Sequence, residues 1–180
     1  MNTSATIDIK SLRQTEPVIV AIGNHQGIIQ SMLDYDYLLG RTSPTIKAIV
    51  AGGRRTARFF FGHQEVVLPL YPIMTALPKA LRQRANLVLN VGSGRRVIES
   101  TSAAIAALPQ LSGVTVFGEG VPERHALKLT ELAAKKGIWV LGAASVGLVI
   151  PGTFKLGAIG GTQASQLVAS RLVEAGPVAV

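Results

Sequence analysis

Short apolar runs alternate along the chain with longer stretches in which apolar residues recur every three or four positions. The runs are rich in Val, Ile and Leu, which is typical of buried strands. They comprise Val18 to Ile22, Ile46 to Ala51, Leu87 to Val91, Val114 to Phe117 and Ile138 to Leu141. A sixth strand region, Phe59 to Phe61 with Val66 to Leu70, surrounds Gly62-His63 and predicts a hairpin or excursion.

Helix-like stretches separate these strands. The stretch from 95 to 108 carries one mainly apolar helical face, made of Val97, Ile98, Thr101, Ile105 and Leu108. Pro122 suits the first position of another helix, which Gly137 ends. A helical stretch that starts at Pro72 must be kinked or restarted at Pro78, because proline lacks an amide hydrogen.

The alternation of strands and helices predicts an α/β fold. We expect a Rossmann-like, doubly wound, mainly parallel sheet in a single domain over residues 17–180, preceded by a polar N-terminal tail at 1–16. Towards the end of the chain, a glycine-rich stretch at 142–161 precedes a helix at 163–174. Residues 178–180 resemble the start of another strand.

Composition sets the class of protein. The 180 residues are 48% hydrophobic, which is enough apolar material for a core, and they include no cysteine, which excludes disulfides and thiolate chemistry. The apolar run from 138 to 150 is shorter than the roughly 20 residues of a membrane-spanning helix. The N-terminus has neither the basic start nor the apolar centre of a signal peptide. We therefore expect a cytoplasmic protein with no membrane segment.

The positive charge is concentrated in one part of the chain. Residues 41–96 contain ten Lys or Arg and one acid, whereas the whole chain carries a formal charge of +8. Such an excess predicts an anionic partner, either a phosphate-bearing ligand or nucleic acid, although a solubilising face remains an alternative.

Ligands of doubly wound sheets bind beyond the carboxyl ends of the strands, which singles out four loops. In the first loop, Gly23, Asn24, His25 and Gln26 stand where a pyrophosphate would meet a helix N-terminus, but a plain tight turn explains its glycines equally well. The second loop combines a flexible backbone with three arginines suited to phosphate oxygens, and phosphate binding is the favoured interpretation. These are Arg54, Arg55 and Arg58.

The third and fourth loops each leave two interpretations open. Ser93 and Arg95 could hold an anion, or Ser93 could be a simple helix cap beside solvated arginines. Glu119, between two glycines, is either a catalytic or positioning carboxylate or a charge that stabilises a helix dipole, and spacing alone favours the dipole. The three histidines are scattered and form no metal-ligand pattern, so we predict no metal site.

Four longer motifs resemble a known family. They are Met32-Leu33-Asp34-Tyr35-Asp36-Tyr37, Phe60-Phe61-Gly62-His63-Gln64-Glu65, Gly118-Glu119-Gly120-Val121-Pro122 and Pro151-Gly152-Thr153-Phe154-Lys155-Leu156-Gly157. In this order they resemble the CoA-binding domain of ATP-citrate lyase and, more distantly, the alpha subunit of succinyl-CoA synthetase. The resemblance runs from about Val18 to Val180 and implies coenzyme A as the ligand.

The resemblance also implies roles for particular residues. By position, the loop from Gly23 to Gln26, with Ser93 and Arg95, would line the CoA site, and Glu119 would lie near a phosphoryl-transfer centre. Arg54, Arg55 and Arg58 fall where the family varies, so their role rests on charge alone. The implied parent reaction converts citrate, CoA and ATP into acetyl-CoA and oxaloacetate.

The implied reaction needs parts that this sequence does not contain. The family's phosphohistidine lies in a flavodoxin-like domain that would begin where this chain stops, and the ATP-grasp and lyase domains are also missing. The chain is thus expected to bind CoA without completing the reaction, either as a piece of a larger enzyme or as a free-standing CoA-binding protein. Its oligomeric state stays open, with a homo-oligomer among the alternatives.

Two other functions compete with CoA binding. A domain that binds NAD would need a carboxylate after the second strand, where arginines stand instead; these count less against NADP. Nucleic-acid binding is disfavoured because the basic region has no aromatic stacking array beyond Phe59 to Phe61.

Overall fold

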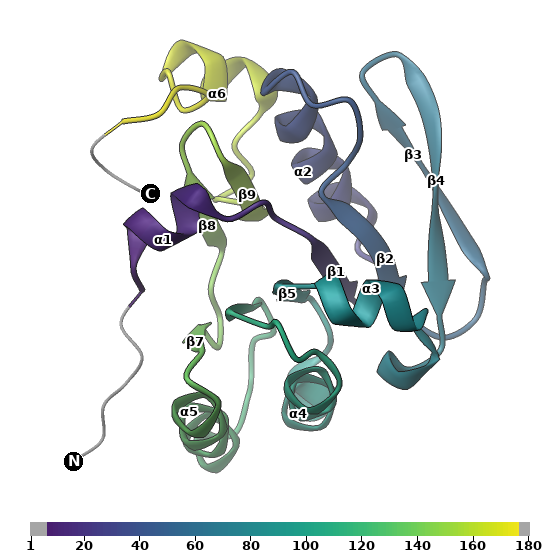
Figure 1. Ribbon diagram of the computed structural model, residues 1–180, viewed down its shortest axis with the longest axis vertical. Helices are drawn as coiled ribbons and strands as arrows, with labels where there is room; N and C mark the ends of the chain where they lie inside the picture. The colour runs from purple at the N-terminus through teal and green to yellow at the C-terminus, as the bar shows by residue number, and fades with distance from the viewer. Residues whose placement is uncertain (1–6, 177–180) are drawn as a thin grey trace.

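The computed structural model describes residues 7–176 and confirms an α/β fold built on a mainly parallel sheet (Figure 1). The helices are α1 (Ile9–Gln14), α2 (Gln26–Leu38), α3 (Lys79–Arg84), α4 (Val97–Ala107), α5 (Glu123–Lys136) and α6 (Ala164–Ala169), with 3-10 turns η1 (Met74–Ala76) and η2 (Gly94–Arg96). The strands are β1 (Ile19–Ile22), β2 (Ile46–Val50), β3 (Thr56–Phe61), β4 (Gln64–Tyr71), β5 (Leu87–Asn90), β6 (Gly113–Val116), β7 (Trp139–Leu141), β8 (Gly147–Ile150) and β9 (Phe154–Gly157).

Within residues 7–176, the main sheet has seven strands in the order β3-β4-β2-β1-β5-β6-β7. Its neighbours are parallel except for β3, which runs antiparallel to β4 as the predicted hairpin. The chain builds outward from β1 through β2 to β4 and then returns to the other side of β1 to form β5. The winding direction therefore reverses between β1 and β5, which is the place where doubly wound sheets bind ligands.

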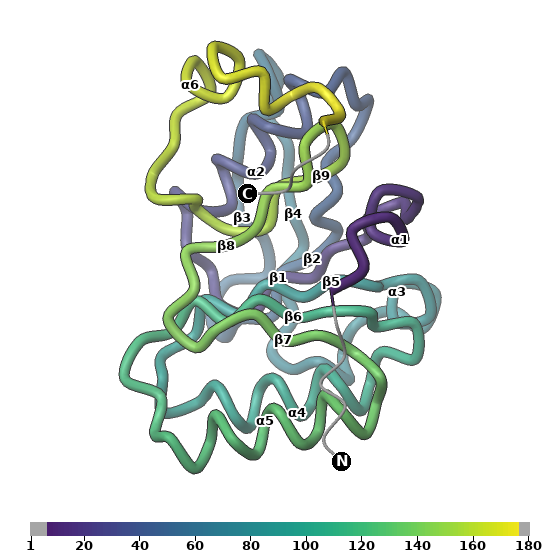
Figure 2. The backbone as a smooth tube through the Cα atoms, turned by 90° about the vertical axis from the view of Figure 1, so that its left-hand side faces the viewer, coloured from purple at the N-terminus to yellow at the C-terminus, as the bar shows by residue number. Residues whose placement is uncertain are grey.

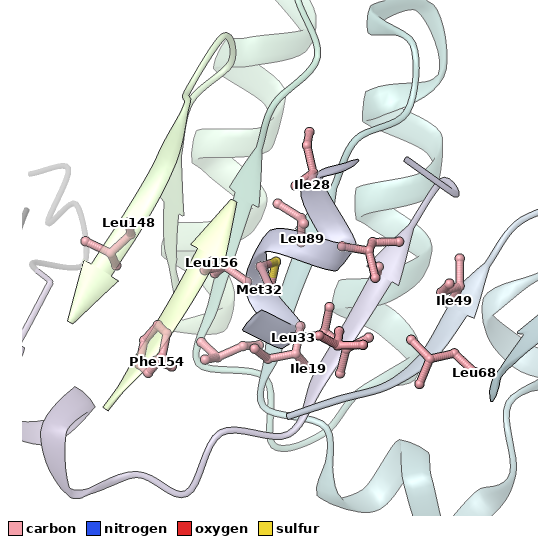
Figure 3. Close-up of a cluster of buried hydrophobic side chains, with 14 of the residues drawn as sticks. Ile19, Ile28, Met32, Leu33, Ile49, Leu68, Leu89, Leu148, Phe154 and Leu156 are labelled. Atoms are coloured by element: carbon pink, nitrogen blue, oxygen red, sulfur yellow. The ribbon is translucent and has the colours of Figure 1, made fainter. Parts of the chain in front are cut away.

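Helices cover both faces of this sheet, with the β8–β9 hairpin beside α2 on one of them (Figure 2). On one face, α2 and the β8–β9 hairpin bury Ile28, Met32 and Leu33 against the strands, together with Phe154 and Leu156 (Figure 3). On the other face, apolar residues of α4 and α5 pack against the same strands. The buried residues of α4 recur at helical spacing, so the helix packs one face against the sheet. The central strands β1 and β5 are buried along their whole length, because elements cover both faces of the sheet.

The glycine-rich stretch at 142–161, where no hairpin is predicted from the sequence, contains the antiparallel β8–β9 hairpin. Leu148 and Ile150 alternate on β8 towards the core, as do Phe154 and Leu156 on β9. Gly147 and Gly157 are paired across the hairpin, and a Cβ on Gly157 would lie 2.7 Å from the Cα of Gly147. The absence of a side chain at these two glycines lets the two backbones approach closely, so glycine occurs here inside a strand pair.

Both ends of the described chain also differ from the prediction. The stretch predicted as a polar tail contains α1, whose Leu12 is buried against the core. The last helix is shorter than expected, since α6 ends at Ala169 and turns follow it. The strand expected at 178–180 lies outside the described residues.

The C-terminal half of α2 holds the β8–β9 hairpin and the segment after α6 in place. The buried hydroxyl of Tyr35 donates to the carbonyl oxygen of Leu172, and burial raises the pKa of this phenol to about 12. Arg41 donates from Nη2 to the carbonyl oxygen of Thr153 at 2.6 Å, and its Nε lies 3.4 Å from the carboxylate of Asp36. These contacts fix the β8–β9 hairpin and the segment after α6 against α2.

Candidate functional site

A cavity of about 530 Å³ opens at the carboxyl ends of β1, β2 and β5, where the winding direction reverses. It is lined by residues 22–24 at the end of β1, residues 50–52 at the end of β2, residues 72–74 after β4, and Gly92 after β5. The wall is completed by Arg96, which caps α4, and by Glu99, Ser100 and Ala103 on one face of this helix. Four separate strand ends and one helix thus converge on a single cavity.

The lining of this cavity combines an apolar surface with a few polar groups. Ile22, Val50, Ile73 and Met74 supply the apolar part. Arg96 is the cation among the lining residues, and Asn24, Glu99 and Ser100 add groups that donate or accept hydrogen bonds. Ligand sites commonly combine apolar walls with a small number of convergent polar groups, so this cavity is the candidate functional site.

Two of the predicted loops meet beside the cavity through their glycines. A Cβ on Gly94 would collide with the carbonyl oxygen of Glu119 and lie 2.9 Å from the carbonyl carbon of Gly120. A Cβ on Gly118 would lie 2.7 Å from the carbonyl oxygen of Gly92. Loops 92–96 and 117–121 therefore pack backbone against backbone, and the exposed side chain of Glu119 extends from this junction.

The residues predicted in the first loop divide between different surroundings. Gly23 and Asn24 line the cavity. The Nδ1 atom of His25 accepts a hydrogen bond from the amide of Ile28 at 3.3 Å, so this histidine caps α2. Gln26 donates from Nε2 to the carbonyl oxygen of Arg58 at 2.9 Å and thereby joins α2 to the edge of β3.

The other predicted anion-binding residues lie around the cavity and outside its lining. Ser93 and Arg95 are exposed on the loop between Gly92 and Arg96, and within the described residues the Ser93 hydroxyl makes no cap hydrogen bond. Arg54 and Arg55 are exposed just after Gly52. Arg58 lies further along β3, where its Nη1 is 3.6 Å from a carboxylate oxygen of Glu65.

Sequence reasoning missed most of the α4 contribution to the cavity. Arg96, Glu99, Ser100 and Ala103 recur at positions i, i+3, i+4 and i+7, so they share one helical face. The sequence alone could have shown this second face, which lies next to the apolar face of the same helix. Ile73 and Met74 carried no comparable signal, because only the fold brings this segment to the ends of β1 and β5.

A second cavity of about 440 Å³ lies on the other side of the N-terminal half of α2. His25, which caps α2, and Gln30 and Asp34 of α2 line it on one side, and residues 158 and 161–164, up to the start of α6, line it on the other. Gln30 donates from Nε2 to a carboxylate oxygen of Asp34 at 2.8 Å. Its Nε2 also donates to the carbonyl oxygen of Phe60, and its Oε1 accepts from the amide of Phe60. These polar groups are thus already used to join α2 to β3.

Neither metal binding nor membrane crossing is indicated in the described part of the chain. Across residues 7–176, no three His, Asp or Glu side chains gather closely enough to ligate a metal ion. The helices in the same range are too short or too polar to span a bilayer.

The sequence of this chain is similar to those of ATP-citrate synthases. No family model matches the chain. A probable ATP-citrate synthase subunit 1 of Neurospora crassa is 36% identical over 154 residues, which cover 83% of this chain and 22% of the relative. Human ATP-citrate synthase is 33% identical over 155 residues, covering 84% of this chain and 14% of the relative. The chain is therefore similar to a part of ATP-citrate synthase.

Solved structures agree with this similarity. ATP citrate lyase of Methanosaeta concilii in complex with (3S)-citryl-CoA superposes with a TM-score of 0.82 at 32% identity, over 88% of this chain and 26% of that one. The Methanothrix soehngenii enzyme in complex with citrate and coenzyme A gives the same values. The resemblance to ATP-citrate lyase predicted from the four motifs is therefore confirmed. This chain spans only about a fifth of the length of the first of these relatives.

Proposed function

We propose that this chain binds coenzyme A in the cavity at the carboxyl ends of β1, β2 and β5. The observation that carries the proposal is that this cavity lies at the reversal of winding in a domain whose ATP-citrate lyase relatives are solved with coenzyme A or citryl-CoA. Its apolar wall, with Ile73 and Met74, suits an adenine ring or a pantetheine arm. The arginines at and around its rim suit phosphates.

The phosphate contacts are assigned by position and charge. Arg96 faces the cavity, and Arg95 with Ser93 lies on the same loop beside it. Asn24 offers its side-chain amide at the N-terminal side of α2, next to His25 and Gln26. Gly23 also lines the cavity, but its backbone amide already donates to the carbonyl oxygen of Val50 at 2.9 Å. Arg54 and Arg55 follow Gly52 at the opposite rim. Together with Arg58 on β3, these arginines supply positive charge in the segments next to the lining, which favours a polyanionic ligand.

In the complete enzyme, this chain would supply the CoA-binding part of an ATP-citrate lyase reaction. The ATP-grasp, phosphohistidine and lyase functions would then come from other domains or subunits, which fits a chain that covers 26% of its solved relatives. The isolated chain is expected to bind CoA and to form no acetyl-CoA from citrate, ATP and CoA.

Binding is tested by isothermal titration of the chain with CoA, dephospho-CoA and NAD. CoA is expected to bind most tightly, and equal affinity for NAD would contradict the proposal.

Arg95→Ala and Arg96→Ala are each expected to weaken CoA binding about tenfold, because each removes a charge-assisted contact with phosphate. The melting temperature should change little, since both side chains are exposed. Arg124→Ala, an exposed arginine of α5 outside the cavity, is the matched control.

Glu119 is assigned to the phosphoryl-transfer step in place of CoA binding. Its carboxylate is exposed on the loop that packs against Gly94, next to the cavity and outside its lining. Glu119→Gln is therefore expected to leave CoA affinity of this chain within about twofold of wild type, as is usual for an exposed surface substitution. Assembled with the other domains, the same variant should slow phosphoenzyme formation. Normal phosphorylation together with weakened CoA binding would reverse the assignment.

A further inference from the structure

Asn90 is a buried polar residue at the reversal of winding. It ends β5, pairs in register with Ile22 of β1 and Val116 of β6, and has no exposed surface. The rest of β5 is Leu87, Val88 and Leu89. The strand therefore changes from apolar to polar at the residue that reaches the ligand-binding edge of the sheet.

Three hydrogen bonds occupy the side-chain amide of Asn90. Its Oδ1 accepts from the amide of Gly92 at 2.9 Å, and its Nδ2 donates to Ser100 Oγ and Thr101 Oγ1, both at 2.9 Å. Because the Gly92 amide can only donate, Oδ1 must face it, and this fixes the orientation of the group. Both amide hydrogens are then used by the two hydroxyls of α4.

These bonds connect Asn90 to three residues that line the cavity. Gly92 and Ser100 are bonded directly. The hydroxyl of Ser100, having accepted from Asn90, donates to the carbonyl oxygen of Arg96 at 2.8 Å. One buried amide thus sets the distance between the loop after β5 and the helical face that carries Arg96, although Asn90 itself is absent from the lining.

From this network we infer that Asn90 is a positioning residue that holds Gly92, Ser100 and Arg96 in the geometry that binds coenzyme A. The inference rests on the proposed function. A purely structural role for Asn90 would predict a loss of stability alone, whereas the network predicts a loss of affinity in protein that is still folded. Buried polar groups that orient a binding loop act through geometry, and small displacements of such groups weaken binding strongly.

Asn86 provides a matched control on the same segment of chain. It precedes β5 at the opposite end of the strand, where its Oδ1 accepts from the amide of Val18 at 2.9 Å and its Nδ2 donates to the carbonyl oxygen of Glu16 at 2.8 Å. Asn86→Leu and Asn90→Leu therefore both remove an asparagine that bonds neighbouring segments. Only Asn90→Leu disturbs the cavity.

CoA affinity is measured by titration at a temperature at which wild type and both variants are folded by circular dichroism. Asn90→Leu is expected to weaken binding on the order of tenfold, because Gly92 and Ser100 lose a buried partner. Asn86→Leu should stay within about twofold of wild type, as expected for a change remote from the ligand. Ser100→Ala is expected to weaken binding less, and its effect should not add to that of Asn90→Leu, because the two residues share one network.

The outcomes separate the inference from the proposed function. A wild-type chain that fails to bind CoA overturns the proposed function, and the positioning role for CoA falls with it. If wild type binds CoA and Asn90→Leu binds equally well, only the inference is overturned. Equal losses of affinity in Asn86→Leu and Asn90→Leu also overturn it, because they would reflect general destabilisation. If Asn90→Leu unfolds, the milder Thr101→Val and Ser100→Ala variants replace it, with unchanged affinity in both as the overturning result.

Discussion

Replacing Gly94 with alanine is expected to lower the free energy of unfolding by about 3 kcal/mol, the upper part of the range for inserting an atom into a packed site. The added methyl group would collide with the carbonyl oxygen of Glu119, with the Gly120 backbone behind it. A backbone cannot rotate aside as a flexible side chain can, so loops 92–96 and 117–121 must separate. The melting temperature should fall by about 6–12 °C for a chain of this length.

Gly52→Ala is the control for this prediction. Like Gly94, Gly52 has a backbone conformation that alanine can adopt, but a Cβ there would meet no atom within 4 Å. Thermal denaturation followed by circular dichroism should show little change for Gly52→Ala and a large loss for Gly94→Ala. Equal stability of the two variants would mean that the loops at Gly94 and Glu119 do not pack as described.

Helices and strands could be predicted from the sequence where their apolar residues recur at one regular spacing or their ends carry clear boundary residues. The apolar face of α4 and the Pro122 and Gly137 boundaries of α5 identify these helices, and Gly137 ends α5 in the left-handed conformation at φ 72°. The hairpin of β3 and β4 was also predicted, because its two runs surround a single turn. In each case, local chemistry and global packing favour the same structure.

The β8–β9 hairpin shows why other parts could not be predicted. Leu148 and Ile150, then Phe154 and Leu156, alternate as strand residues should, but glycines at 147, 152 and 157 interrupt the pattern. From sequence alone, these glycines indicate a loop. Their role depends on close approach of two backbones, which is a property of the folded pair.

The candidate site was predictable at the level of loops and less so at the level of side chains. Topology alone identifies the loops after β1, β2 and β5 that surround the cavity. Which residue of a loop faces inward depends on the phase of the helix that follows: the lining includes Arg96 and omits Arg95. Ile73 and Met74 join the site through the return of the chain after β4, which no local pattern encodes.

Replacing Lys155 with methionine is expected to raise the free energy of unfolding at neutral pH by about 2 kcal/mol, a typical gain when a buried charge gives way to an apolar side chain. Lys155 on β9 is 1% exposed, and within the described residues its Nζ has no hydrogen-bond partner. Burial lowers the pKa of this lysine, and the charge of Asp34 opposes the shift only in part. Methionine keeps the length of the side chain without the charge, so the melting temperature should rise by about 4–8 °C.

The pH dependence of stability tests the same explanation. The folded-state pKa of Lys155 lies below its ordinary value of 10.5, so the unfolded chain binds more protons between these two values. The free energy of unfolding of the wild type should therefore rise with pH through that interval, because Lys155 loses its buried charge. The measurement is made up to about pH 10, above which other lysines and tyrosines of the unfolded chain titrate. Lys155→Met should lack this gain, so its advantage over wild type should shrink as the pH rises. Lys135→Met, at an exposed position of α5, is the control and should show neither effect. A lower melting temperature for Lys155→Met at neutral pH would contradict the explanation, because it would mean that the buried ammonium makes a favourable contact.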